Sequence, residues 1–176
     1  MKKLILLFII AVGAHCFAGD LVWKTGSGLE KWHALFRVKC IADAEGLKLT
    51  DIGYDHAIGI ENLDIDPTKY NTLEITYRAR IGRSKTVGQF YFANANSRFS
   101  DARCWRLPTM KNDGKWHTLK ATLNDLPDKS SWLDGGIINK LRLDLLDPAG
   151  GEIDIAQIKL SYDPAVSSAS PVDGII

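Results

Sequence analysis

The chain has 176 residues and a formal net charge of +1, because 22 lysines and arginines nearly balance 21 aspartates and glutamates. This length corresponds to a single domain, which is large enough to bury a core without a lattice of metals or disulfides. Acidic and basic residues are mixed along the chain. This mixing argues against a nucleic-acid-binding protein, since such proteins carry a basic stripe.

Residues 1–18 have the layout of a secretory signal peptide. A two-lysine start precedes an unbroken apolar run over 4–12, and small residues follow up to Ala18. The apolar run is shorter than the roughly 20 residues that a membrane anchor needs, and no later run approaches that length. We therefore expect cleavage before Gly19 and a secreted protein, periplasmic or extracellular. Lipidation at Cys16 is the alternative, which the bulky residue before it disfavours.

Most of the chain after Ala18 alternates between apolar and polar residues. A period of two places one set of side chains on a buried face and the other set in solvent, as in antiparallel sheets with one wet face. The apolar members are, in chain order, Phe36, Val38 and Cys40; Leu47 and Leu49; Leu73, Ile75, Tyr77 and Ala79; His117, Leu119, Ala121 and Leu123; and Leu141, Leu143 and Leu145. Many short strands separated by turns predict an all-β, two-sheet antiparallel β-sandwich.

Two of the expected strands change phase midway. Ile58 and Ile60 occupy even positions, whereas Leu63 and Ile65 occupy odd ones. In the second strand the change is from odd to even, with Ile153 and Ile155 followed by Ile158 and Leu160. A one-residue bulge in each strand would keep both halves facing the core.

Turn motifs separate the strands. Asn112-Asp113-Gly114 is the strongest hairpin signal, because glycine accepts the positive φ that such a turn requires. Short helical turns are expected near 67–70 and 130–132. The sandwich domain is expected to span 19–162, and 163–176, which lacks periodicity, to form a disordered tail.

Several motifs in this order are similar to the galactose-binding-like jelly-roll domains of bacterial secreted glycoside hydrolases. In this chain the motifs lie at 62–66, 70–73, 88–92, 113–118, 132–138, 141–144 and 153–160. The resemblance covers about residues 45–162, and it implies a jelly roll that binds carbohydrate on one sheet face or on edge loops. It also implies that a structural calcium ion is possible. No motif places calcium ligands. Asp64 and Asp66, separated by one residue, could be calcium ligands, but we expect them to cap the turn at Pro67 instead.

The candidate sugar-binding residues are outward-facing members of three expected strands. Alternation places Arg78 on one strand, Gln89 and Tyr91 on a second, and Arg142 and Asp144 on a third. Planar polar groups and an aromatic ring suit the hydroxyls and C–H faces of sugars. The alternative is a solvated face on which arginines pair with carboxylates of neighbouring strands. Both interpretations stay open at this point.

The tryptophans mostly suit the core, which large aromatic residues dominate. We expect Trp116 to cover one end of the core and Trp132 to anchor a loop. Trp105 is flanked by arginines, which suits exposure, but it shares its parity with Leu107, which turns it inward.

Two cysteines, Cys40 and Cys104, remain after removal of the signal peptide. Cys40 shares the parity of Phe36 and Val38 and is expected to point into the core. If Cys104 points inward, it could meet Cys40 in a buried disulfide, and Trp105 would stand on the outer surface as a candidate sugar platform. If Trp105 points inward, Cys104 faces outward. A disulfide with Cys40 is then geometrically unfavourable, because the two Cα atoms must come within about 7 Å.

Enzyme motifs are nearly absent. The histidines lack metal-site spacing, and His117 is expected to be a hydrogen-bonded core residue. There is neither a nucleophile elbow nor a phosphate loop. Together with the resemblance, this predicts a secreted, non-catalytic carbohydrate-binding protein with no nucleic-acid partner and no membrane span after signal removal. A structural or protein-interaction sandwich of the cell envelope is the second interpretation, and a small glycan-active enzyme is the third.

Overall fold

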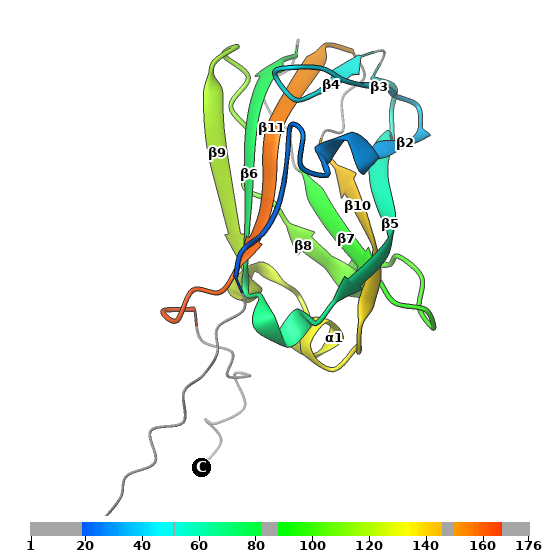
Figure 1. Cartoon of the computed structure of the whole chain (residues 1–176), viewed down its shortest axis with the longest axis vertical. Helices are drawn as coiled ribbons and strands as arrows, with labels where there is room; N and C mark the ends of the chain where they lie inside the picture. Colours follow the sequence, from blue (N-terminus) through cyan, green and yellow to red (C-terminus); the bar gives the residue numbers. More distant parts are fainter. Residues whose placement is uncertain (1–18, 51, 82–87, 146–149, 167–176) are drawn as a thin grey trace, which may run out of the picture.

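The computed structural model describes residues 19–50, 52–81, 88–145 and 150–166 (Figure 1). The predicted signal peptide, with Cys16, lies outside these residues, and so does 167–176 of the predicted tail. Residues 163–166 are described, and there the side chain of Val166 is buried and the backbone N–H of Asp163 donates to Asn71 Oδ1 at 2.7 Å. The folded domain therefore extends four residues beyond the expected boundary.

The described strands form two antiparallel sheets. Sheet A has the order β3-β4-β11-β6-β9, and β1 pairs with β11 beside β4. Its strands are β1 (Leu21–Lys24), β3 (Lys39–Ala42), β4 (Leu47–Thr50), β6 (Thr72–Arg80), β9 (Trp116–Thr122) and β11 (Glu152–Ser161). Sheet B has the order β2-β5-β10-β7-β8. Its strands are β2 (His33–Phe36), β5 (Ala57–Ile65), β7 (Gln89–Ala93), β8 (Cys104–Arg106) and β10 (Ile138–Asp144).

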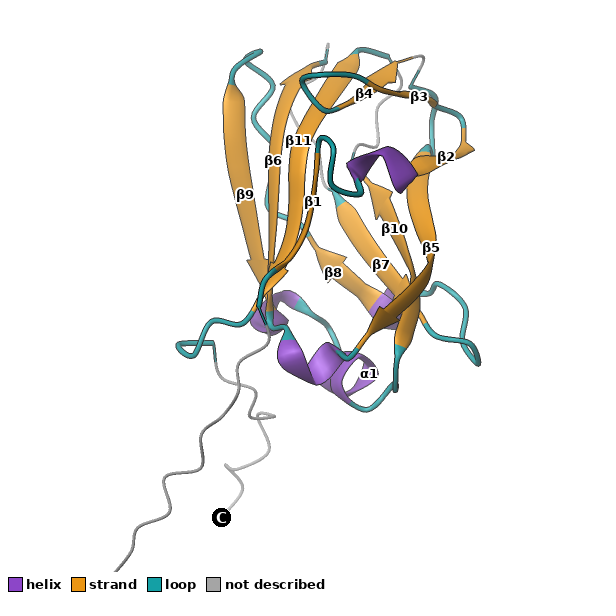
Figure 2. Cartoon of the chain, viewed as in Figure 1, coloured by secondary structure: helices purple, strands orange, loops and turns teal. Residues whose placement is uncertain are grey.

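Short helical segments connect the strands. They are the 3-10 turns η1 (Leu29–Lys31), η2 (Pro67–Lys69), η3 (Asp101–Arg103) and η4 (Leu123–Asp125), and the helix α1 (Lys129–Leu133). The helical turns expected near 67–70 and 130–132 are thus confirmed as η2 and α1. Figure 2 shows the helical segments around α1 gathered at one end of the two sheets. The all-β, two-sheet sandwich predicted from alternation is confirmed.

The core lies between the two sheets and is rich in aromatic side chains. Trp132 is fully buried, with Phe92 and Trp105 packed edge-on against it at centroid distances of 4.8 and 5.0 Å. Its indole N–H lies 2.9 Å from the backbone oxygens of both Pro67 and Tyr70. Trp132 thus fastens α1 to the turn η2, because a buried polar atom must find a partner.

The register is irregular at both predicted positions, with the predicted single extra residue in β11 and two extra residues in β5. The register between β11 and β6 shifts between Ile155 and Gln157, which leaves Ala156 as the extra residue. The register between β5 and β10 shifts in the segment that contains Asn62. Asn62 adopts a left-handed conformation with φ of 59°. Each bulge restores the inward direction of the apolar residues that follow it.

Two local predictions are wrong. The run from Phe36 to Cys40 is two strands in different sheets, because Arg37 between them has φ of 52° and turns the chain. The motif Asn112-Asp113-Gly114 does not close a hairpin. Gly114 has φ of 75° and its N–H donates to Ala79 at 3.0 Å, but β9 pairs with β6 rather than with the preceding strand β8.

Several side chains also differ from expectation. Trp116 does not cover the core, because it shares the outward phase of Thr118 and remains 40% exposed. His117 is only partly buried, and its Nε2 lies 2.8 Å from Asp113 Oδ1 in the exposed turn. Trp105 is fully buried, as its parity with Leu107 predicts.

Candidate functional site

The five predicted site residues lie on opposite faces of the molecule. Arg78 is on β6 and points outward from sheet A, whereas the other four point outward from sheet B. There Arg142 lies opposite Tyr91, and Asp144 lies opposite Gln89. The structure therefore brings together four of the five residues. Alternation shows which side chains face solvent, but not to which sheet a strand belongs.

The sheet B residues are bound to one another. Arg142 donates to both oxygens of Asp144, at 2.7 Å from Nε and 2.5 Å from Nη2. Its guanidinium also lies over the rings of Phe36 and Tyr91, at 4.7 and 5.0 Å from their centroids. Burial raises the pKa of the Asp144 carboxyl, against the opposing effect of the Arg142 hydrogen bonds. These contacts already use most of the hydrogen-bonding capacity of Arg142 and Asp144, so little of it remains for a ligand.

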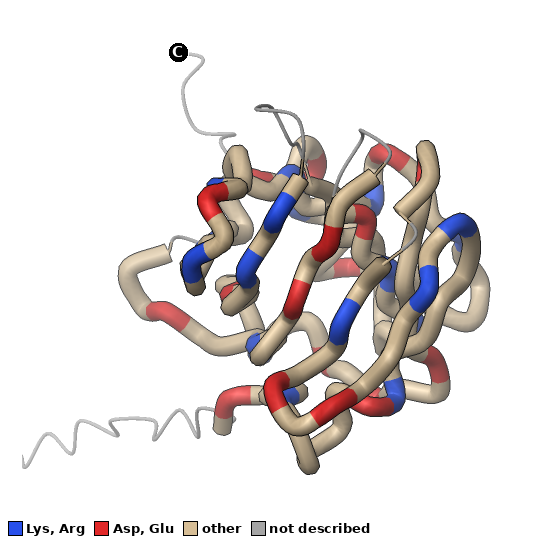
Figure 3. The backbone as a smooth tube through the Cα atoms, turned by 90° about the horizontal axis from the view of Figure 1, so that it is seen from above, with Lys and Arg blue, Asp and Glu red and all other residues tan. Residues whose placement is uncertain are grey.

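Arg78 on the opposite face is equally engaged. It donates to Asp154 and to Glu45, both at 2.9 Å, and its guanidinium lies 4.7 Å from the ring centroid of Trp116. Figure 3 shows acidic and basic residues interspersed along the backbone. The cross-strand pairing predicted as the alternative to sugar binding is present on sheet A, where Arg78 on β6 binds Asp154 on β11, whereas on sheet B Arg142 pairs with Asp144 of its own strand.

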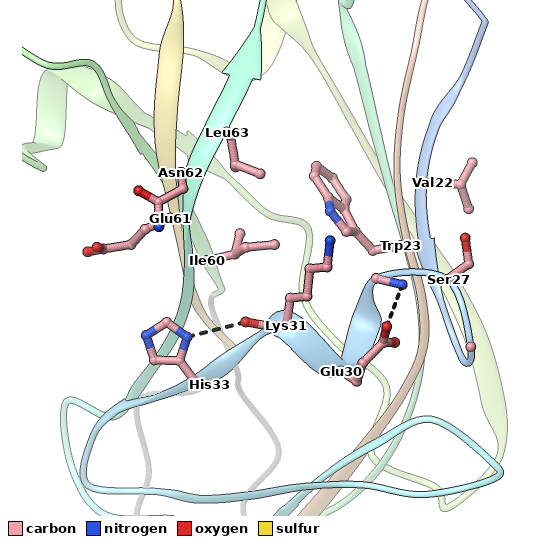
Figure 4. Close-up of a pocket in the computed structure, with 12 residues that line it drawn as sticks. Val22, Trp23, Ser27, Glu30, Lys31, His33, Ile60, Glu61, Asn62 and Leu63 are labelled. Atoms are coloured by element: carbon pink, nitrogen blue, oxygen red, sulfur yellow. Dashed lines mark hydrogen bonds between the residues drawn. The ribbon is translucent and has the colours of Figure 1, made fainter.

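A cleft of about 770 Å³ opens between β1 of sheet A and β5 of sheet B, with η1 along one side (Figure 4). This volume lies within the range of about 300–1,000 Å³ that is typical of small-molecule sites. The cleft exists because β1 and β5 belong to different sheets, and the sheets part at this edge.

Polar and apolar groups both line the cleft, and its inner side includes Trp23 and Ile60, which are 5% and 2% exposed. Trp23 projects from β1 toward Ile60 and Leu63, which project from β5 (Figure 4). Trp32 packs edge-on against Trp23, with centroids 5.8 Å apart and ring planes at 87°, and fixes the orientation of its indole. Leu63 is the more accessible of these side chains, and with the small exposed part of the indole it can contact the C–H groups of a ligand.

The bulge in β5 shapes this side of the cleft. Ile60 and Leu63 are three residues apart and would point to opposite sides of a regular strand. The left-handed conformation of Asn62 lies between them and brings both side chains to the cleft. A positive φ outside glycine is uncommon, although asparagine tolerates it better than most residues, and such strain is concentrated at functional sites.

The rim of the cleft is polar, with Ser27 and Glu30 on the η1 side and His33 and Glu61 toward β5. Two of these groups are engaged. Glu30 Oε1 accepts from the backbone N–H of Gly28 at 3.1 Å, and Glu61 lies 3.6 Å from Lys140 Nζ. Lys31 extends its amine from η1 into the space between the walls (Figure 4).

The resemblance to jelly-roll domains allows a structural calcium ion. Among the described residues, no group of three or more histidine, cysteine, aspartate or glutamate side chains is placed to hold a metal ion. Asp66, which we considered as a ligand, caps η2 instead: it accepts from the Thr68 N–H at 3.1 Å and from its hydroxyl at 2.6 Å. These hydrogen bonds hold the pKa of Asp66 below its usual value.

No family model matches the chain, and no curated protein matches it. Solved structures do match. A family 11 carbohydrate-binding module of a Clostridium thermocellum cellulosomal cellulase is 16% identical, with a TM-score of 0.57, over 82% of this chain and 95% of that module. The fold is that of carbohydrate-binding modules. A xylan-binding module of family 15 gives a TM-score of 0.57 at 11% identity, over 81% of this chain and 96% of the other.

A third structure with the module fold is a low-affinity xylan-binding module of family 86 from the gut symbiont Roseburia intestinalis. It is 8% identical, with a TM-score of 0.52, over 84% of this chain and 98% of that module. The predicted resemblance to carbohydrate-binding jelly rolls is thus confirmed for the fold. No helix within 19–50, 52–81, 88–145 or 150–166 is long and apolar enough to cross a membrane.

Sequence reasoning missed the cleft of this module-like chain. The change of phase between Ile60 and Leu63 was the one signal that pointed to it, and it was interpreted only as a bulge. Trp23 was assigned to the core, where it packs on Trp32, although one side of it faces the cleft. Nothing in the sequence distinguishes Lys31 from the other exposed lysines.

Proposed function

We propose that this chain is a non-catalytic carbohydrate-binding protein that holds a saccharide in the cleft between β1, η1 and β5. The observation that carries the proposal is the cleft itself, with an oriented indole and aliphatic side chains as its wall and polar groups along its rim. A sugar ring offers C–H groups to such a wall and hydroxyls to such a rim.

The fold supports a saccharide as the ligand. The similar modules of families 15 and 86 bind xylan, and a family 11 module has been solved with a mixed-linked β-1,3-1,4 tetrasaccharide. The predicted signal peptide supports the same proposal, because polysaccharides are encountered outside the cytoplasm.

The carboxylates support binding without catalysis. A glycosidase needs a carboxylic acid of raised pKa in its substrate site. Asp144, whose pKa is raised by burial, lies on the outer face of sheet B and does not line the cleft. The two carboxylates at the rim, Glu30 and Glu61, are already engaged with Gly28 and Lys140.

Two alternatives remain. The outward residues Gln89, Tyr91, Arg142 and Asp144 form a second candidate sugar surface on sheet B. A structural or protein-interaction role is favoured by the internal pairing of both outer faces, with Arg78 bound to Asp154 and Glu45 on the other sheet.

A glycan array followed by titration calorimetry on the exported protein tests the proposal. Leu63→Trp fills the cleft, because the Leu63 side chain points between its walls, and should reduce saccharide affinity at least about tenfold. Trp116→Ala, which removes an exposed aromatic residue from the outer face of sheet A, is the control and should leave binding unchanged.

The outcomes separate the alternatives. Binding that survives Leu63→Trp but is lost in Gln89→Ala would move the site to the outer face of sheet B. Absence of binding to every saccharide on the array would contradict carbohydrate binding and favour the structural role.

A further inference from the structure

Lys31 is held so that its side chain extends into the cleft. Its backbone N–H donates to Gly28 at 3.1 Å, and its carbonyl oxygen lies 3.3 Å from His33 Nδ1. Lys31 is an exposed residue, and its amine extends into the space between the walls of the cleft (Figure 4).

The charge of this amine is not matched by the protein. In the part of the chain that the structure describes, no carboxylate lies within 4.0 Å of Lys31 Nζ, although other lysines such as Lys120 and Lys159 have such partners. Glu30 and Glu61 line the same cleft, but in Figure 4 their carboxylates lie away from the amine.

Because Lys31 is exposed and has no carboxylate partner among the described residues, its charge is accessible to a ligand that enters the cleft. A hydrogen bond between an ammonium and an anion is about twice as strong as one between neutral groups. An anionic group on the ligand would therefore gain more at this position than a sugar hydroxyl.

From this geometry we infer that the cleft selects acidic saccharides, and that Lys31 binds the anionic group of the sugar, either a uronate carboxylate or a sulfate ester. The inference rests on the proposed function, and it narrows the ligand from saccharides in general to anionic ones. Trp23, Ile60 and Leu63 would contact the apolar face of the same sugar.

Matched pairs of saccharides test the inference. The probes are oligogalacturonate and glucuronic-acid-bearing xylo-oligosaccharide, each with its carboxyl-reduced neutral counterpart, and a sulfated oligosaccharide with its desulfated form. Calorimetry on the exported protein should give at least one acidic probe an affinity about tenfold above that of its neutral counterpart. The carboxylate and sulfate pairs show which anion the cleft prefers.

Lys31→Gln should remove this difference, and Lys31→Arg should keep most of it. Lys24→Gln is the matched control, because Lys24 is an exposed lysine whose pairing with Gln157 places it on the outer face of sheet A, opposite to Trp23. This variant makes the same change in net charge and should leave the affinities for both members of a pair unchanged.

The outcomes distinguish the inference from the proposed function. Equal affinity for acidic and neutral members, lost in Leu63→Trp, would overturn charge selection and leave saccharide binding in the cleft intact. Equal loss of both members in Lys31→Gln would also overturn it, since Lys31 would then act through packing of its aliphatic stem. No binding to any probe or array saccharide would contradict both.

Discussion

Cys104 and Trp105 are neighbours on β8 and face opposite sides of sheet B. Trp105 is fully buried in the core, and Cys104 lies opposite Tyr91 on the other side of the sheet, where it is also buried. Cys40 lies on β3 in sheet A, and both cysteines are free. Two thiols on different sheets, with one turned away from the core, do not meet the distance that a disulfide requires.

Thiol titration of the unreduced protein should therefore find two free thiols, at Cys40 and Cys104, after unfolding. In the folded protein both should react slowly at neutral pH, because burial raises the pKa of each thiol to about 11 and keeps it protonated. Absence of free thiols in the unfolded, unreduced protein would contradict the placement of these two strands.

Arg142 is the most heavily engaged of the predicted site residues, since it binds Asp144 and two aromatic rings. Arg142→Ala should lower the free energy of unfolding by about 2 kcal/mol, because it leaves the Asp144 carboxylate, whose side chain is 13% exposed, without its partner. Denaturant unfolding measures this change. The double variant Arg142→Leu with Asp144→Leu should recover most of the loss, because both charges are then removed.

A stability of Arg142→Ala equal to that of the wild-type protein, together with loss of saccharide binding, would contradict this account. It would show that Arg142 serves ligand binding rather than stability, as its outward-facing position in the alternating pattern first suggested.

At the level of the elements, the bulge in β5 determines the shape of the cleft. Asn62 is exposed and adopts a φ of 59°, so the effect of a substitution there is mainly conformational. Asn62→Gly should be nearly neutral, because glycine adopts positive φ freely. Asn62→Val should cost about 1–2 kcal/mol, because a β-branched residue is strained in this conformation. Denaturant unfolding of the two variants measures the difference.

Saccharide affinity should follow the same order, with Asn62→Val weakened and Asn62→Gly retained, because the bulge aligns Ile60 and Leu63. Equal stability of the two variants would mean that the bulge is not maintained by this residue.

Local periodicity predicted the elements well and their partners poorly. The phase changes in β5 and β11 were visible in the sequence, because a shift in parity is a local property of one strand. The turn at Asn112-Asp113-Gly114 was also visible, but the pairing of β9 with β6 depends on contacts far apart in sequence. The phase of Trp116 was overlooked: it matches Thr118 and places the indole outside.

The prediction of the site was incomplete for the same reason: periodicity within one strand does not show which strands pack together. Alternation identified Arg78 and Arg142 as outward-facing, which is correct, but the two belong to opposite faces. The cleft is formed by Trp23 on one sheet and Ile60 and Leu63 on the other, so it exists only once the sheets are packed. No pattern within a single strand could have predicted it.

At the scale of the whole molecule, two sheets with internally paired outer faces enclose an aromatic core and part at one edge. The outer arginines are bound to carboxylates, whereas the cleft at this edge is lined by the largely buried indole of Trp23 and by a lysine amine without such a partner among the described residues. The central claim is that the protein binds saccharide at this edge and not on a sheet face.

Nuclear magnetic resonance of the ¹⁵N-labelled exported protein, titrated with the tightest-binding saccharide of the array, tests this claim most directly. We expect the largest shifts at the indole N–H of Trp23 and at the backbone amides of Lys31 and Leu63, because these groups line the cleft. The indole signal of Trp116 should stay unchanged. Shifts centred on Trp116, or on Tyr91 and its neighbours, with Trp23 unaffected, would contradict the account.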